Sequence, residues 1–330
     1  MADEAGNLYG TSSYGGIGYN GLNSQTGYGT VFKVLANGDI ITLHSFTGGS
    51  DGSNPGYGLT WGMDGNLYGV TAFGGASNNG TIFRISRDGN LTNLHTFNGY
   101  NGSRPIHPLC VAQDGHLYGT TYLGGNGYQT PPPFATGAGT VFRISTNGDF
   151  SMILQFGGTN GFAPHSKLMA MEDGNLYGTS SEGGATYNAP FSIGDGSIFC
   201  LRTNGTLSMV HSFSSSINQG ARSPMGGVVQ GNDGRLYGTT FVGGVHGYGT
   251  VFRISVPMSP ILQSPVLTNN NLLLTWSSVA EQTYQLQYTT NLLLPAWFDL
   301  GSVTIATNGT MSASDAISGP QRFYRVVVLP

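Results

Sequence analysis

One block of sequence returns five times along this chain, at a spacing of 50 to 60 residues. Each copy begins with Leu-Tyr-Gly, ends with a Gly-Gly pair, and is followed by a second block of the form Gly-Thr-Val-Phe-Arg-Ile. In four copies a third block, of the form Leu-His-Ser-Phe, comes next, and a proline leads into the following copy. Self-similarity at this period predicts a repeat architecture with one supersecondary unit per copy. The repeat units open at Leu8, Leu67, Leu117, Leu176 and Leu236.

Each repeat unit predicts four short strands, named a to d in chain order. Asp-Gly between strands a and b, and Asn-Gly or Asp-Gly between strands c and d, are strong hairpin signals because both turn positions tolerate positive φ. Strands b and c carry apolar residues on both faces, which indicates sheets covered on both sides. These features predict an all-β fold, with a β-propeller of about five kelch-like four-stranded blades over residues 1–257. Unit one lacks strand a and unit five lacks strand d, so we expect the two ends to share the seam of a closed ring.

The combined pattern of the blocks, over roughly residues 6–255, resembles the GloVer (choice-of-anchor) tandem repeat of bacterial extracellular proteins. The resemblance implies an exported, surface-associated, propeller-like protein, located outside the cell or on the bacterial surface. It implies no established reaction and therefore supplies no catalytic residues. The opening "MADEAGNLYG" carries no signal peptide, so either an export signal was removed or the chain begins inside a longer protein. No sorting tail follows Pro330, unlike the anchored members of the family.

The C-terminal segment differs from the repeats. After a linker at residues 258–265, glycine becomes rare and several short segments alternate between apolar and polar residues. This pattern predicts a small β-sandwich over residues 266–330, which resembles a fibronectin type III-like module. We expect Trp276 and Tyr324 to be its core aromatics.

Composition narrows the classes of partner. The net charge of −4 shows no basic excess, so nucleic acid is not an expected partner, and no apolar run reaches the length of a membrane span. Cys110 and Cys200 have no metal-like spacing; we interpret them as buried thiols and leave a disulfide open. No metal site is predicted, and cofactor and oligomeric state stay unknown. The expected partner is a polysaccharide or another extracellular ligand.

A residue found at one place in every unit is expected to serve the fold. Three such sets recur: turn carboxylates, strand c cations and histidines. At the histidine position the third unit has Leu154, so we interpret this position as one of packing and not of metal binding. The sets are the turn carboxylates Asp64, Asp114, Asp173 and Asp233, the strand c cations Lys33, Arg84, Arg143 and Arg253, and the histidines His44, His95 and His211.

Two carboxylates of unit four break the pattern. Glu182 stands where the other units have Tyr14, Phe73, Leu123 and Val242, and Asp195 lies at the other end of the same b–c loop. Such a pair is a candidate catalytic pair, with general acid and base or nucleophile roles in glycoside hydrolysis. The alternative is a surface charge and a loop turn.

Antiparallel connections place the b–c and d–a loops at one end of the sheets, and the variable sequence concentrates there. Aromatic rings that stack on sugar faces, with a few polar groups, favour glycan binding as the function. A carbohydrate-active enzyme is the second hypothesis, including a polysaccharide lyase that would use a histidine base and an arginine. A structural or adhesive surface module is the third. The candidate ligand-binding residues are Tyr19, Tyr28, Arg104, His107, Tyr128, Phe134, His165, Tyr187, Phe191 and Arg222.

Overall fold

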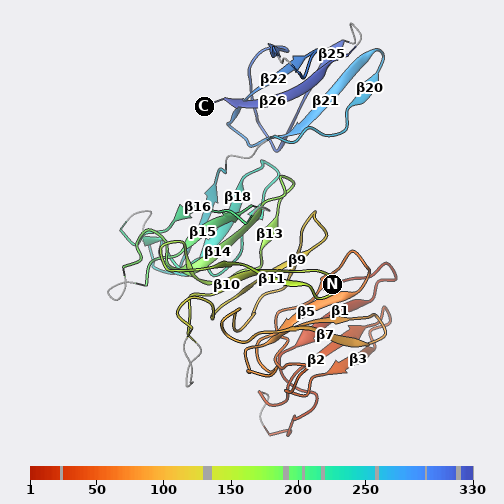
Figure 1. Ribbon diagram of the computed structural model, residues 1–330, viewed down its shortest axis with the longest axis vertical. Coiled ribbons are helices and arrows are strands. Elements are labelled where there is room, and N and C mark those ends of the chain that lie inside the picture. The colour runs from red at the N-terminus through yellow and green to blue at the C-terminus, as the bar shows by residue number, and fades with distance from the viewer. Residues whose placement is uncertain are drawn as a thin grey trace. The chain divides into compact units, whose positions relative to one another are not determined.

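The structure is a computed structural model that describes residues 1–22, 25–128, 136–188, 193–202, 205–216, 220–256, 260–293, 296–316 and 321–329. Within these ranges the regular elements are all β-strands, and they pair antiparallel in several small sheets (Figure 1). None of the described residues forms a helix long and apolar enough to cross a membrane. The chain forms two compact parts, Met1–Gly227 with Thr239–Thr250, and Val228–Gly238 with Val251–Pro330.

The first two repeat units each form one sheet. Unit one has the order β1 (Leu8–Ser12), β2 (Thr30–Val34) and β3 (Ile40–Ser45). Unit two has the order β4 (Thr60–Trp61), β5 (Leu67–Thr71), β6 (Thr81–Ile85) and β7 (Leu91–Thr96), which is the predicted order a to d.

The next three units repeat this arrangement with small changes, which confirms the predicted strands b and c in every unit. Unit three comprises β8 (Cys110–Val111), β9 (Leu117–Thr121), β10 (Thr140–Ile144) and β11 (Phe150–Gln155). Unit four adds a strand before strand a and comprises β12 (Phe162–Pro164), β13 (Met169–Ala170), β14 (Leu176–Glu182), β15 (Ser197–Leu201) and β16 (Leu207–Ser212). Unit five is the three-stranded sheet β17 (Val229–Gln230), β18 (Leu236–Thr240) and β19 (Thr250–Ile254).

The two terminal units differ from the prediction in one respect. The described part of unit five has no strand d, as expected. In unit one, however, the first two residues stand where strand a lies elsewhere. Ala2 forms a bridge with Leu8, and the Met1 carbonyl accepts a hydrogen bond from the Tyr9 N–H at 2.7 Å. Unit one therefore has a remnant of strand a, and closure of a ring stays a prediction.

The repeated aspartates make the a–b hairpins. In unit two the Asp64 carboxylate accepts a hydrogen bond from the Asn66 N–H at 3.2 Å and another from the Tyr68 hydroxyl at 2.8 Å. Gly65 has a φ of +75°, which a side chain would disfavour. Because strand b supplies the tyrosine, one side chain holds both the turn and the strand after it. Asp114 and Asp233 bind Tyr118 and Tyr237 in the same way.

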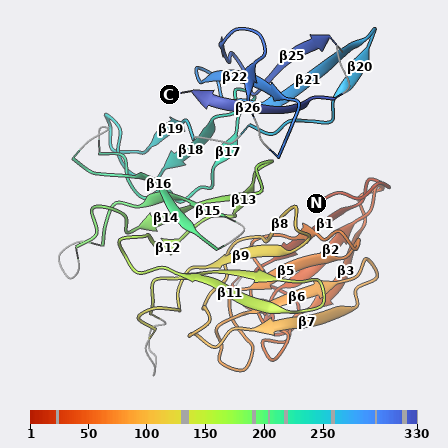
Figure 2. The same cartoon turned by 45° about the horizontal axis from the view of Figure 1, so that its top comes forward.

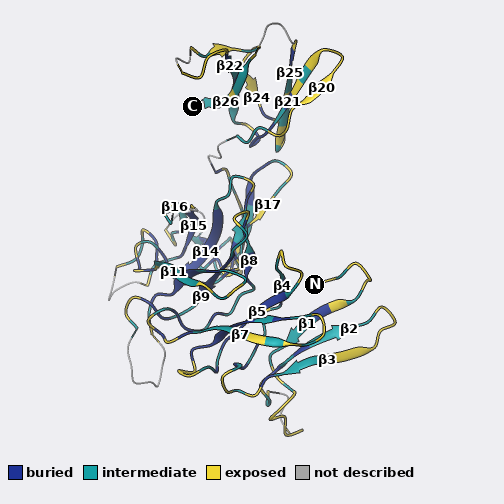
Figure 3. Ribbon diagram, turned by 45° about the vertical axis from the view of Figure 1, so that its right-hand side comes forward, coloured by how far each residue is buried: buried dark blue, intermediate teal, exposed yellow. Residues whose placement is uncertain are grey.

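Strand alternation gives each repeat sheet two apolar faces. The face toward the next unit, here called the front face, carries the tyrosine of strand b and the first aliphatic residue of strand c. The face toward the preceding unit, here called the rear face, carries the leucine of strand b and the phenylalanine of strand c. The core between units one and two shows the pattern: Tyr9, Val31 and Phe46 come from the front of unit one, and Leu59, Leu67, Phe83 and Ile85 from the rear of unit two. Matching cores join units two to three and three to four. Figures 2 and 3 show the stacked sheets and the buried strands.

The glycine of each Leu-Tyr-Gly block makes this packing possible. In unit three the Phe142 ring lies across Gly119, so closely that a Cβ on Gly119 would overlap the ring and the Leu109 side chain. The same close approach joins Phe83 to Gly69 and Phe199 to Gly178. The repeated glycine is therefore required by space and not by its backbone conformation.

The C-terminal segment forms two sheets around one core. One sheet has the order β20 (Val266–Thr268), β21 (Asn271–Ser277) and β25 (Thr310–Ala316). In the other, β22 (Thr283–Thr289) pairs with β23 (Phe298–Asp299), β24 (Thr304–Ile305) and β26 (Phe323–Leu329). Trp276 is buried in the core between the sheets and Tyr324 packs against it, in agreement with the prediction.

The second compact part also contains the a–b hairpin of unit five. The Arg235 guanidinium forms an ion pair with Glu281 and donates to the Ala280 carbonyl at 3.0 Å, and the Ala280 N–H donates to the Asp233 carbonyl at 2.9 Å. These contacts bind the hairpin to the C-terminal sheets. The compact parts therefore divide inside unit five, whereas the predicted boundaries at residues 257 and 266 follow the sequence repeat.

Candidate functional site at the loop end

The b–c and d–a loops meet at one end of the repeat sheets, here called the loop end. Before each proline, a residue with positive φ turns its N–H toward the carbonyl that ends a b–c loop. These hydrogen bonds measure between 2.8 and 3.0 Å. They therefore hold the two kinds of loop together, as the connectivity predicts. The four pairs are Asn54 with Tyr28, Arg104 with Asn79, Ala163 with Ala138, and Ser223 with Asp195.

Four rings from three repeat units form a continuous series at the loop end, here called the ring series. The ring centroids of Tyr57 and His107 are 5.9 Å apart, and those of His107 and His165 are 5.1 Å apart. Tyr122, at the end of strand b of unit three, meets His165 edge to face at 5.5 Å. The other three residues follow the prolines that lead into units two, three and four. The structure thus brings together the predicted site residues His107 and His165 and adds Tyr57 and Tyr122.

His107 is the least satisfied member of the series. Its Nε2 atom is buried and has no hydrogen-bond partner among the described residues. Burial, together with the charge of neighbouring His165, lowers the pKa of His107 to about 4. The imidazole is therefore neutral near pH 7 and has an unused nitrogen, which can donate or accept according to its tautomer.

Glu182 lies beside this series, half-buried at the end of β14. Its carboxylate has no hydrogen bond or ion pair within the described ranges, and burial raises its pKa. Burial, and to a smaller extent the negative charge of Glu182, raises the pKa of Tyr122, whereas the positive charge of Arg104 lowers it. Both charged groups therefore face Tyr122. The Arg104 guanidinium also lies 5.1 Å from the centre of the Phe73 ring.

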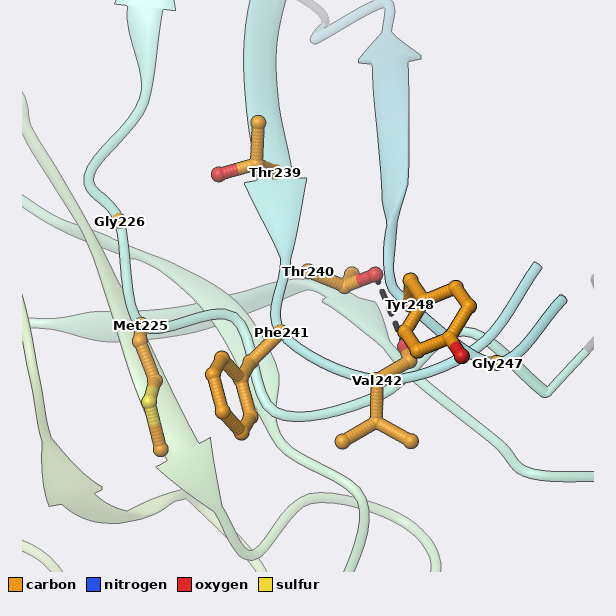
Figure 4. A pocket seen from close by; sticks show the side chains of 8 residues that line it. All are labelled: Met225, Gly226, Thr239, Thr240, Phe241, Val242, Gly247 and Tyr248. Atoms are coloured by element: carbon orange, nitrogen blue, oxygen red, sulfur yellow. Dashed lines mark hydrogen bonds between the residues drawn. The ribbon is translucent and has the colours of Figure 1, made fainter.

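A pocket of about 430 Å³ adjoins the ring series at unit five. Figure 4 shows Met225 and Phe241 side by side on one side of it, with Val242 and Tyr248 on the other. Met225 connects the two features, because its carbonyl lies 3.4 Å from His165 Nδ1 while the residue also lines the pocket. Tyr248 is 91% exposed, so its ring is free to meet a ligand.

Sequence reasoning missed Tyr57, Tyr122, Met225, Phe241 and Tyr248. A signal for two of them was present: at the position of Tyr122 and Phe241, the other units have the small residues Ser13, Ala72 and Ser181. A bulky ring that replaces a small residue in a repeat is a departure of the same kind as Glu182.

Asp195, the predicted partner of Glu182, is occupied elsewhere. Its Oδ2 atom accepts a hydrogen bond from the Ser215 N–H at 2.9 Å, and its own N–H donates to Thr186 Oγ1 at 2.9 Å. With the Ser223 N–H on its carbonyl, Asp195 joins three loop segments. These contacts give its carboxylate a structural role, and a catalytic role for the pair stays a prediction.

Two of the predicted binding aromatics pack between repeat units. The Tyr128 ring lies against Gly99 of unit two, and the Tyr187 ring lies against Gly158 of unit three. Tyr187 also stacks on Phe162 at 6.4 Å. These rings therefore cover the loop of the preceding unit, which leaves less of each ring for a ligand.

The remaining predicted aromatics and Arg222 are placed as follows. Tyr19 occupies the position of Tyr128 and Tyr187 in unit one, and it is 54% exposed. Tyr28 is exposed and packs against Gly18 and Gly48. Arg222 is exposed, and its backbone pairs with Val242 beside the pocket. Phe134 and Phe191 lie outside the described residues.

The repeated histidines pack on the phenylalanine two residues later. His44, His95 and His211 meet Phe46, Phe97 and Phe213 edge to face at 4.9, 5.0 and 4.9 Å. His95 also stacks on Phe150 of the next unit at 3.6 Å. In the described ranges no three His, Cys, Asp or Glu side chains are grouped so as to hold a metal ion.

We expect His95→Leu to flatten the dependence of stability on pH. Burial lowers the pKa of His95 from 6.5 to about 4, so the unfolded chain binds a proton more readily between these values. The free energy of unfolding therefore falls as pH drops from about 6.5 toward 4, and leucine removes this effect. Because the ring is only partly buried, we expect the loss between about pH 7 and pH 5 to shrink by about 1 kcal/mol.

The measurement is thermal unfolding at the two pH values. At about pH 7 the substitution is expected to cost within about 1 kcal/mol, because leucine fills a similar volume. A wild-type melting temperature that rises with added metal, and loses this rise in the variant, would contradict the packing role.

Comparison with known families follows the repeat. The sequence profile of the Gloeobacter/Verrucomicrobia repeat matches residues 1–192 and residues 130–260. The chain belongs to this family. The membership confirms the tandem-repeat resemblance seen in the sequence. The loop end lies within the residues that match this Gloeobacter/Verrucomicrobia repeat. The match ends before the C-terminal sheets, so the fibronectin type III-like assignment stays a prediction. A comparison with curated proteins finds no match.

Several solved structures resemble this Gloeobacter/Verrucomicrobia repeat protein loosely. A gluconolactonase of Xanthomonas campestris is 19% identical, with 74% of this chain and 75% of the other covered and a TM-score of 0.40. An α-L-arabinofuranosidase of Clostridium thermocellum is 13% identical, with 73% and 80% covered and a TM-score of 0.38. A GH43_12 protein from a capybara gut metagenome is 10% identical, with 98% and 86% covered and a TM-score of 0.36. These likenesses are too loose to assign a fold or a reaction.

Proposed function

We propose that this protein is an exported β-propeller that binds a hydroxyl-rich ligand, a glycan, at its loop end. The observation that carries the proposal is the buried Nε2 atom of His107 within the ring series, which has no hydrogen-bond partner in the part of the chain that the structure describes. A buried polar atom without a partner costs free energy, and a ligand hydroxyl would supply the missing hydrogen bond. The adjoining pocket of about 430 Å³ has a size typical of small-molecule sites.

The chemistry of the loop end suits a sugar. Tyr57 and Tyr248 expose rings that can lie against the apolar face of a sugar. His107 and the half-buried carboxylate of Glu182 can then take hydrogen bonds from its hydroxyl groups. The face-to-face packing of repeated small sheets supports the propeller, and the sequence resemblance supports export to the cell surface or medium.

His107→Phe is expected to weaken glycan binding about 3- to 10-fold, because it removes one hydrogen bond but keeps a ring between Tyr57 and His165. Binding would be measured by calorimetry with a glycan first found on an array. His116→Phe is the matched control, since His116 lies in the a–b hairpin of unit three, among turn residues away from the ring series. Equal affinities of the two variants would place the binding site elsewhere, and no ligand on a broad array would favour the adhesive module.

Acid–base turnover at the same site is the second candidate. Its support is that burial raises the pKa of Glu182, whose charge acts on Tyr122, and lowers the pKa of His107, which lies on the other side of His165 from Tyr122. Glu182→Gln is then expected to abolish turnover and keep binding. Full activity of this variant would contradict acid–base turnover through Glu182. The rate should fall as pH rises through the raised pKa of Glu182, and also as pH drops toward about 4, where His107 is protonated.

A further inference from the structure

The front face of unit five is covered at its a–b hairpin, where Arg235 contacts Ala280 and Glu281, but its strand c lacks a cover within the described residues. Its strand c residue Val251 is 79% exposed. The equivalent residues of the other four units, Val31, Ile82, Val141 and Ile198, are completely buried by a neighbouring sheet or by their own strand d. An apolar side chain placed for burial and left in water marks a contact surface.

The rear face of unit one is exposed in the complementary way. Leu8 is 52% exposed, while the equivalent leucines Leu67, Leu117, Leu176 and Leu236 are buried. On the same face Phe32 and Val34 are only partly buried, although their equivalents in units two to four are completely buried or nearly so. The chain therefore carries one uncovered front face and one uncovered rear face, the two halves of the contact that it uses between its own units.

We propose that the front face of unit five binds the rear face of unit one of a second copy, so that copies of this chain associate head to tail. The contact would repeat the core between units one and two, with Val251 and Tyr237 against Leu8 and Phe32 of the second copy. This inference is independent of the proposed ligand site, because none of these residues belongs to the ring series or to the pocket.

A polar contact between internal units supports the same pairing. The Arg84 guanidinium, on the front face of unit two, donates to the carbonyl of Thr146 in the c–d turn of unit three at 3.3 Å. Unit five has Arg253 at the position of Arg84, and unit one has Ala36 at the position of Thr146. Arg253 is exposed, and although its charge acts on Glu281, its guanidinium has further donors for this bond with the Ala36 carbonyl of a second copy.

The association would be heterologous, since two different faces meet. Such a contact extends into longer assemblies unless the geometry closes a ring. Because the described part of unit five has no strand d, its front face lacks the phenylalanine that Phe46, Phe97, Phe156 and Phe213 supply elsewhere. The contact between copies is therefore smaller than the internal ones, and we expect it to be reversible and dependent on concentration.

The test is sedimentation velocity of the full chain over a range of concentrations, with two single variants. Val251→Asp places a charge on the front face of unit five, and Leu8→Arg places one on the rear face of unit one. Because both positions are exposed, we expect both variants to fold. The wild type should grow in mass with concentration, and each variant alone should stay monomeric. Their equimolar mixture should form a heterodimer and nothing larger, because each variant keeps the face that the other has lost.

Val245→Asp is the matched control, since Val245 is also 79% exposed in unit five but lies in the b–c loop. It should associate like the wild type. A wild type that stays monomeric at every concentration would overturn the proposal, and so would a mixture of the two variants that stays monomeric. A monomeric wild type whose melting temperature falls with Val251→Asp would show instead that the chain covers its own front face.

Discussion

Phe142→Ala is expected to lower the free energy of unfolding by about 3–5 kcal/mol, the usual cost of removing a fully buried aromatic side chain. Phe142 lies completely buried on the rear face of unit three, with its ring across Gly119. It also meets Phe97 of unit two edge to face at 5.3 Å. The substitution therefore opens a cavity in the core that joins two repeat units. Urea unfolding followed by circular dichroism measures the loss.

Phe32→Ala is the matched control for this prediction. Phe32 occupies the same strand position in unit one and lies over Gly10 in the same manner, but it is only partly buried. We expect a loss of about 1–2 kcal/mol, because part of its surface already meets water. Equal losses for the two variants would contradict the view that burial between units, rather than packing within one sheet, stabilises the repeat.

Tyr187→Ala is expected to cost about 2–3 kcal/mol, and Tyr19→Ala less than about 0.5 kcal/mol. The two tyrosines occupy equivalent positions in their units. Tyr187 covers Gly158 of unit three and stacks on Phe162, whereas Tyr19 is 54% exposed. The difference therefore measures the contact of a b–c loop with the preceding unit.

The free energies of unfolding of the two tyrosine variants are measured by the same urea titration. If Tyr187→Ala kept full stability but lost glycan affinity, the ring would serve a ligand rather than the fold. Because Tyr187 is partly buried, some effect on binding is compatible with the packing role, but the loss of stability must come with it.

The strands and hairpins of this protein could be predicted from the sequence because their causes are local. Asp64 and Gly65 specify a hairpin by their own turn geometry, and the alternation in strands b and c specifies which side chains share a face. Comparison of the units with one another also separated structural from unusual residues. Asp64, Asp114 and Asp233 bind the tyrosines of strand b, the repeated histidines pack on phenylalanines, and Glu182, which breaks the pattern, has a carboxylate with no partner among the described residues.

Only the tertiary structure decided which of the unusual residues meet. Tyr57, His107, Tyr122 and His165 are separated by up to about a hundred residues in sequence, and the stacking of three sheets brings their rings together. The same stacking turned Tyr128 and Tyr187 toward glycines of the preceding unit, while Asp195 turned toward Ser215. Alternation within a strand determines the face on which a side chain lies, whereas its partner across that face depends on how the next sheet is placed, and that placement comes from contacts between distant residues.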